Sequence, residues 1–527
     1  MKRYIRKATF GLSLAAITLS SCEKQLDLQP LNDVTSEVVY SSAEGYRQSL
    51  AKVYGSFALT GNSGPAGSPD VVGLDEGSNG DFFRTFWQAQ ELSSDEAVIA
   101  WGDAGVQDFH NMNWTTDNPF LKGLYYKSIY QITLINEFLR QSTDEKLSER
   151  SIAGNDAEQI RKYRAEVRFL RAFQYWVLMD MYGNPPFVTE NDLIGSLPKQ
   201  ITRSELFKYV ESELKAIETE LPDTKTADHY GRANKFAAQA LLARVYLNAQ
   251  IYSGTAKNAE AMAYSKKVID GGYSLMKNYR NLMLNDNNLN NPESIMTINY
   301  DGNKTRLFGG TTFLAHASVG GSMNAADYGL DAGWGGLRTT KALVNLFPNG
   351  DGSLDKRAQF YTNGQALEIN SISTFKDGYA VTKYQNKNSA GVSGSNSTFV
   401  DADIPLFRLA EMYLIYAEAT VRSGSGDNGL ALTYFNNLRT RAYGNTSGNV
   451  GALTLDLILD ERARELYWEG HRRTDLVRFG KFTTADYVWP WKGGVKAGKS
   501  VEAFKNIFPL PSADVTANPN LVQNTGY

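Results

Sequence analysis

Apolar residues recur at helical spacing in several long stretches of the chain. Between Pro119 and Arg140 they fall at intervals of three and four residues, which is the period of an amphipathic helix. The stretch from Asp156 to Tyr182 repeats this pattern over a greater length. A Gly-Asn-Pro-Pro sequence at 183–186 follows it and is typical of a helix end. The pattern therefore predicts a mainly helical protein.

Two segments that lie far apart in the sequence resemble each other. Phe236 to Ile269 and Phe407 to Ala442 each contain an alanine-rich helical stretch, a short turn and a second helical stretch. Such helical hairpins are similar to tetratricopeptide units, although the wide spacing excludes a regular tandem array. We predict a tetratricopeptide-like scaffold of irregular helix-turn-helix repeats with a large insertion between the repeats.

The insertion and two other regions are rich in glycine, asparagine and serine. Within the insertion, Glu293 to Tyr300 alternates like a short strand. Long ordered loops on a rigid frame often carry function. We expect one domain over 37–527, with the helical scaffold at about 37–280 and 400–480. A loop-rich ligand-binding lobe would comprise about 61–118, 280–400 and 481–527.

The N-terminus has the pattern of a bacterial secretory signal. A basic start is followed by a short apolar run from Ala8 to Leu19 and by the sequence Leu-Ser-Ser-Cys, which ends at Cys22. The apolar run is too short to span a bilayer. The pattern predicts a lipoprotein signal peptide over 1–21, acylation of Cys22 and a lipidated tether over 22–36, because two or three acyl chains anchor a protein stably. An ordinary signal peptide with a chance cysteine is the alternative.

Composition and motifs exclude several classes of function. Removal of residues 1–21, which carry four basic and no acidic residues, changes the net charge from −3 to −7, and nucleic-acid binding needs a basic face instead. The four histidines form no metal-binding pattern, and no catalytic serine or phosphate-loop motif is present. Abundant carboxylates leave a glycosidase pair open. Alternating charges over 460–478 are interpreted as structural ion pairs.

We expect neither a cofactor nor a metal, with one alternative. The Asn-rich segment around Asp286 has the oxygen ligands that calcium prefers, but it lacks the glycine and the terminal glutamate of an EF-hand loop. A solvated turn is the other interpretation of that segment.

The aromatic residues suggest a surface that binds sugars. Flat rings pack against the apolar face of a sugar, while planar polar side chains bind its hydroxyl groups. Trp334 is the strongest single candidate because glycines flank it, whereas a tryptophan taken alone is more often a core residue. The other tryptophans considered, in each case against a place in the core, are Trp87, Trp101, Trp114, Trp489 and Trp491.

The chain resembles the SusD/RagB family of outer-membrane nutrient-uptake lipoproteins. The similarity covers essentially the whole chain, and its pattern is closest to the starch-binding founding member. The segments that carry it are AEVRFLRAFQYWVLMDMYG at 165–183, GRANKFAAQALLARVYLNA at 231–249, DIPLFRLAEMYLIYAEA at 403–419, ERARELYWEGHRRTDLVRFG at 461–480 and FPLP at 508–511.

The resemblance implies a non-enzymatic, cell-surface lipoprotein of the outer membrane. It would capture oligosaccharides, with starch or malto-oligosaccharides favoured, and deliver them to a TonB-dependent SusC-like transporter. A lid of the transporter with weak affinity of its own and a binder of levan or laminarin are the alternatives. A surface glycosidase is a third hypothesis.

The resemblance also implies the binding residues. The glycan-binding positions would be Arg84, Trp101, Phe308 and Trp334, with Ile99, Ala104 and Arg306 as weaker candidates. Two of these depart from the founding member, because Ile99 replaces a tryptophan and Ala104 replaces an asparagine. Loss of a stacking ring costs on the order of 1 kcal/mol of binding free energy, so Trp101 would take over that role.

Overall fold

A computed structural model describes residues 35–62, 64–65, 69–75, 77–289 and 291–527. The predicted signal peptide, Cys22 and the tether as far as residue 34 lie outside the described residues. Most of the described elements are helices. They are α2 Ser36–Val39, α3 Ala43–Ala58, α4 Phe82–Trp87, α5 Asp108–Asn111, α6 Pro119–Gln141, α7 Asp144–Glu149, α8 Gly154–Tyr182, α9 Arg203–Ile217, α10 Lys235–Leu247, α11 Ala249–Ser253, α12 Asn258–Ile269, α13 Gly310–Ala317, α14 Lys341–Val344, α15 Leu409–Ser423, α16 Asn428–Tyr443, α17 Leu455–Leu466, α18 Arg472–Arg478 and α19 Ser512–Ala517.

The strands are short and form separate antiparallel pairs. They pair as β1 Val98–Ile99 with β5 Leu337–Arg338, β2 Pro186–Phe187 with β3 Lys199–Gln200, β4 Ser294–Ile298 with β8 Ile404–Arg408, and β6 Phe360–Tyr361 with β7 Ala380–Val381. The predicted strand within Glu293–Tyr300 is confirmed as β4.

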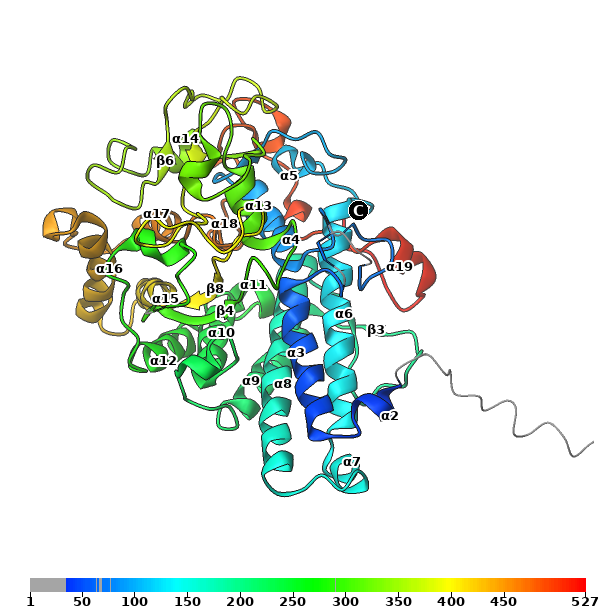
Figure 1. The fold of residues 1–527 in the computed structure, drawn as a ribbon. Helices are drawn as coiled ribbons and strands as arrows, with labels where there is room; N and C mark the ends of the chain where they lie inside the picture. The colour runs from blue at the N-terminus through cyan, green and yellow to red at the C-terminus, as the bar shows by residue number, and fades with distance from the viewer. Residues whose placement is uncertain (1–34, 63, 66–68, 76, 290) are drawn as a thin grey trace, which may run out of the picture.

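The two long helices predicted from the sequence are α6 and α8, and they pack against each other. The side chain of Asn118 caps α6 by accepting hydrogen bonds from two backbone amides, and Pro119 occupies the first turn. Gly183 ends α8 with a φ of 71°, a conformation that a side chain disfavours. Together with α3 and α9 these helices form one part of the scaffold (Figure 1).

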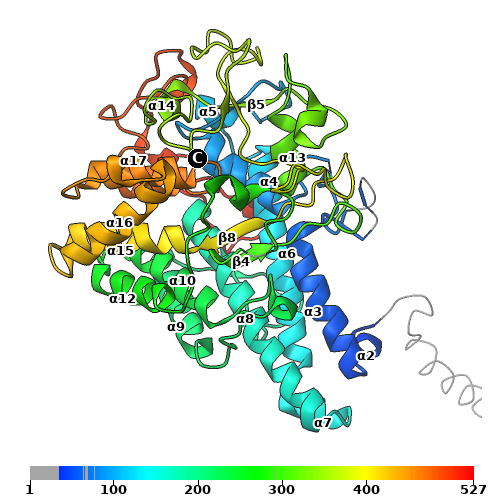
Figure 2. The same ribbon diagram turned by 60° about the vertical axis from the view of Figure 1, so that its left-hand side comes forward.

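The two similar segments are helical hairpins, as predicted, and they lie side by side. α10 pairs with α12, and α15 pairs with α16, while α12 packs directly against α15 (Figure 2). The insertion thus leaves the helical stack after α12 and returns to it through β8. The mainly helical, tetratricopeptide-like class is confirmed.

Many of the loop-rich segments gather at one end of the scaffold, whereas the C-terminal helix α19 lies along its side (Figure 1). In both views α5, α13 and α14 lie in the upper part of the molecule, above the stacked helices (Figures 1 and 2). The proposed boundaries between scaffold and lobe remain a prediction.

A network of buried ion pairs joins segments that are distant in the sequence. Arg408, at the end of β8, contacts Glu293 (2.7 Å), Glu465 (2.6 Å) and Glu469 (2.6 Å), and all four side chains are almost fully buried. Arg357 contacts Glu461 at 2.7 Å in the same network. The charges over 460–478 are therefore structural, as interpreted. Most of their pairs are tertiary contacts and only two have helical spacing, Arg464 with Glu461 and Arg478 with Asp475.

Replacing Arg408 by Met should destabilise the fold strongly, because Glu293, Glu465 and Glu469 would lose their shared cation in the interior. The expected loss is about 3–5 kcal/mol in the free energy of unfolding, measured by urea unfolding of the soluble form that starts after Cys22. The control is Arg47→Met, which breaks an exposed pair with Glu44 and should leave the midpoint nearly unchanged. Equal midpoints for the two variants would contradict a structural role for the network.

The stability that Glu461 contributes should disappear in acid. Coulombic attraction and hydrogen bonds from the surrounding arginines outweigh burial and lower the pKa of Glu461 from 4.5 to about 2. A lowered carboxyl pKa stabilises the folded state above pH 4.5, and this contribution is lost as the pH falls through about 2. The difference in unfolding free energy between the native protein and Glu461→Gln should be largest above pH 5, at roughly 3 kcal/mol, and shrink toward pH 2. A pH-independent difference would contradict the assignment.

Candidate ligand-binding surface

Three of the aromatic residues implied by the resemblance lie together. The ring centroids of Trp101 and Trp334 are 6.3 Å apart, and those of Trp334 and Phe308 are also 6.3 Å apart. All three side chains are partly exposed. They come from three separate loops of the lobe, and we call this group the aromatic arc.

Trp334 rests on a histidine beneath it. The Trp334 and His316 rings stack with centroids 4.6 Å apart and planes 22° apart, and the Trp334 amide donates to the His316 carbonyl oxygen. The Gly335 amide donates to the carbonyl oxygen of Val319. The glycines beside Trp334 therefore let two backbone segments run in close contact, and this contact presents the ring.

Trp101 follows β1 and is fixed against Trp334. Its indole Nε1 donates to the carbonyl oxygen of Trp334 at 3.2 Å. A Cβ atom on Gly336 would lie 2.5 Å from the Trp101 ring, so only glycine leaves room for this approach. The pairing of β1 with β5 brings Trp101 and Gly336 together.

Arg84 lies beside the arc but is mostly buried. Its guanidinium lies over the rings of Phe313 (4.4 Å) and Trp101 (5.7 Å), and Nη1 donates to the carbonyl oxygen of Phe308 at 3.3 Å. Burial lowers the pKa of Arg84 to about 10, so the group stays cationic at neutral pH. One carboxylate oxygen of Asp81 accepts hydrogen bonds from the backbone amides of both Arg84 and Gly310. In this geometry Arg84 positions two residues of the arc, Trp101 and Phe308.

A pair of buried acids connects the segment before β1 to α18 and to the segment just before it. Arg472 on α18 contacts both carboxylate oxygens of Asp95 at 2.7 Å. The next residue, Glu96, accepts from the Trp468 amide at 3.1 Å, and its carbonyl oxygen accepts from Thr339 beside β5 at 2.7 Å. Burial and the neighbouring acids raise the pKa of Glu96 well above its usual value. The strands that carry the arc are thus attached to the end of the scaffold.

The structure corrects one of the weaker site candidates. Ile99 is fully buried in β1, so its side chain does not belong to the ligand-facing surface. Ala104 and Arg306 are exposed, and the Arg306 guanidinium lies over the Phe399 ring at 5.1 Å, next to Phe308.

Three of the other tryptophans are core residues. Trp87, Trp114 and Trp489 are buried, as the alternative interpretation expected, and Trp491 is partly buried with its Nε1 donating to the Ile369 carbonyl oxygen.

Three residues that support or adjoin this surface escaped the sequence analysis. The buried His316 stacks on Trp334, the buried Phe313 packs against both Arg84 and Trp101, and the partly exposed Phe375 lies near Gly320, Gly321 and Gly335. No motif marks them, because each acts through a contact between segments distant in the sequence.

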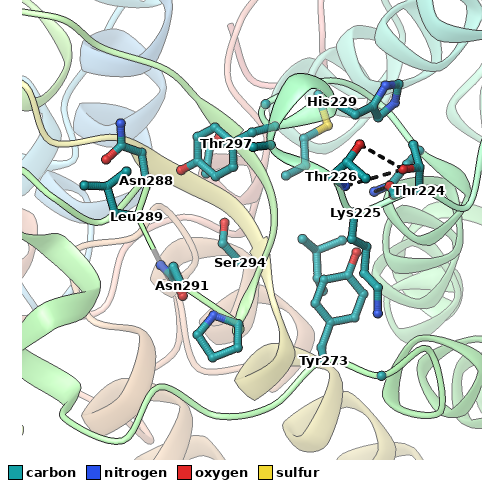
Figure 3. A pocket seen from close by; sticks show the side chains of 18 residues that line it. Thr224, Lys225, Thr226, His229, Tyr273, Asn288, Leu289, Asn291, Ser294 and Thr297 are labelled. Carbon is teal, nitrogen blue, oxygen red and sulfur yellow. Dashed lines mark hydrogen bonds between the residues drawn. The ribbon is translucent and has the colours of Figure 1, made fainter.

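A cavity of about 710 Å³ lies elsewhere, between the segment before α10 and the segment before β4 (Figure 3). Lys225 and Tyr273 form one wall, while Asn288 and Ser294 lie on the other, and no residue of the arc lines it.

The calcium alternative at Asp286 stays a prediction. The Asp286 carboxylate accepts hydrogen bonds from the amide and hydroxyl of Ser389. Within the described ranges, no group of three or more His, Cys, Asp or Glu side chains is arranged to hold a metal ion. No helix of the described part of the chain is long and apolar enough to cross a bilayer.

The fold and the arc define a class of protein, a tetratricopeptide-like helical frame that presents aromatic rings on loops. Comparison with known proteins identifies the family. Residues 354–527 match the family described as "SusD family", and residues 71–247 match the one described as "Starch-binding associating with outer membrane". The chain is 35% identical to starch-binding protein SusD of Bacteroides thetaiotaomicron, with all of both chains covered. It belongs to the SusD family.

Solved structures agree on the fold. A SusD superfamily protein from Parabacteroides distasonis superimposes with a TM-score of 0.71 at 22% identity, covering 94% of this chain and 100% of that one. A laminarin-binding SusD-like protein gives a TM-score of 0.67 at 23% identity, covering 92% and 99%.

Replacing Gly336 by Ala should displace the Trp101 ring, because the new methyl group would overlap it. Tryptophan fluorescence should shift and the Trp101–Trp334 contact should open, while the fold remains. Gly451→Ala is the matched control, since a Cβ atom there meets nothing within 4 Å. Unchanged fluorescence in Gly336→Ala would contradict the described contact.

Proposed function

We propose that this chain captures glucan oligosaccharides at the cell surface and does so on the aromatic arc. The observation that carries the proposal is the grouping of Trp101, Phe308 and Trp334 as adjoining, partly exposed rings. Rings tilted toward one another offer a curved apolar platform to successive sugars of a bent chain. Starch is favoured because the 35% identical relative is a starch-binding protein.

The cellular setting proposed here is the outer face of the outer membrane. Acylation of Cys22 would anchor the chain, and a TonB-dependent SusC-like transporter would receive the bound oligosaccharide. The family described as associating with the outer membrane supports this setting. The proposed role is binding and transfer, without catalysis.

The second candidate function is that of a lid on the transporter, with only weak affinity of its own for glycans. Two observations favour it: Ile99 is buried and has no ring to offer a sugar, and the small side chain of Ala104 offers no hydrogen bond. Binding that appears only when the transporter is present would support this candidate.

Trp334→Ala should weaken binding of malto-oligosaccharides about tenfold or more, because the central ring of the arc is lost. Isothermal titration of the soluble form that starts after Cys22 measures this, with laminarin and levan as parallel ligands. The melting temperature should fall only slightly, since the ring is partly exposed.

Tyr264→Ala is the control for this titration. Tyr264 is a partly exposed ring on α12 in the scaffold, where Lys267 lies over it at 4.0 Å. The control should bind as the native protein does. Equal affinity of the Trp334 variant and the native protein would contradict a glycan site on the arc.

A further inference from the structure

Large aliphatic side chains are exposed together on one side of the molecule. Leu193 (82% exposed), Ile194 (80%) and Leu197 lie in the loop between β2 and β3, and Val522 (71%) lies in the C-terminal segment. Hydrogen bonds join the two segments, and we call these four exposed side chains the apolar edge. Exposed apolar patches of this kind usually mark an interaction surface.

The apolar edge is held in place by hydrogen bonds. Gln200 exchanges two hydrogen bonds with the backbone of Val522, at 2.9 and 3.1 Å. Asn518 donates to the carbonyl oxygen of Pro198 at 2.8 Å. These hydrogen bonds fix the segment that follows the loop tip against the C-terminal segment.

Both acidic residues of the loop have hydrogen-bond or ion-pair partners within the protein, although Asp192 itself is exposed. The Asp192 carboxylate accepts from the amide and hydroxyl of Thr189 at 2.7 and 3.0 Å. Glu190 pairs with the buried Arg171. The tip itself has the sequence Leu-Ile-Gly-Ser-Leu at 193–197 and carries no charge.

The apolar edge lies on the side where the described chain begins. Ser36 donates to Glu137 at 2.8 Å, Glu137 pairs with Arg140, and Arg140 donates to the Glu190 carbonyl oxygen at 3.0 Å. Val38 in α2 adds another exposed aliphatic side chain. Figure 1 shows α2, β3 and α19 along one side of the molecule.

The length of chain before this point brings a membrane within reach. Only 12 residues separate Cys22 from Thr35, and the 13 steps between these two Cα atoms span at most about 45 Å. An acylated Cys22 would thus keep the start of α2 within that distance of the lipid surface.

We propose that the apolar edge inserts into the lipid surface as a second membrane contact beside the acyl chains. The proposal rests on the proposed acylation of Cys22. The transfer of aliphatic side chains from water to the acyl region is favourable. A second contact would also restrict rotation of the protein about its lipid tether.

The test uses the lipidated full chain in phosphatidylcholine vesicles without any transporter. Because Cys22 is the only cysteine and its thiol is acylated, Ile194→Cys supplies a single free thiol for a polarity-sensitive dye. The matched control is Val392→Cys, on an exposed loop of the lobe. We expect blue-shifted emission at position 194 and iodide quenching several-fold weaker than at position 392. Melting curves of both variants check that the fold is retained.

Equal quenching at the two positions on vesicle-bound protein would overturn the proposal. Shielding of position 194 that appears only after the transporter is added would also overturn it, in favour of a protein contact. If the chain does not stay with the vesicles, the acylation of Cys22 fails, which separates failure of the proposed anchoring from failure of the apolar edge.

Discussion

The ion pair between Arg472 and Asp95 is the contact on which the geometry of the lobe depends. It attaches the segment before β1 to the last scaffold helices through two short hydrogen bonds in the interior. Burial of a charge is unfavourable unless its partner is held in good geometry, so the pair requires both segments to adopt one arrangement. Trp101 follows within six residues of Asp95, and its position is therefore set from the scaffold.

The separate network of buried ion pairs around Arg408 and Arg357 constrains the fold in the same way. Arg408 in β8 joins Glu293, next to β4, to Glu465 on α17, and Arg357 joins the insertion to Glu461. A lobe built of short strands and long loops has little hydrogen-bonded secondary structure of its own. Charged contacts to the helical frame supply the rigidity that a preformed binding surface needs.

The sequence predicted the frame well because local patterns determine it. The periodicity of α6 and α8, the stop at Gly183 and the likeness of the two hairpins are all visible along the chain. The candidate ligand-binding surface was harder to predict from the sequence. Spacing singled out Trp334 through its glycines, and the family resemblance added Trp101, Phe308 and Arg84, but neither showed that Ile99 is buried. The contributions of His316 and Phe313 depend on contacts across the fold, which no local pattern encodes.

The most direct measurement of the central claim is a crystal structure of the soluble form grown with a malto-oligosaccharide. The account predicts sugar rings packed against Trp101, Phe308 and Trp334, with the frame around Asp95 and Arg472 unchanged. An oligosaccharide bound in the cavity beside Tyr273, with the three rings of the arc bare, would contradict it.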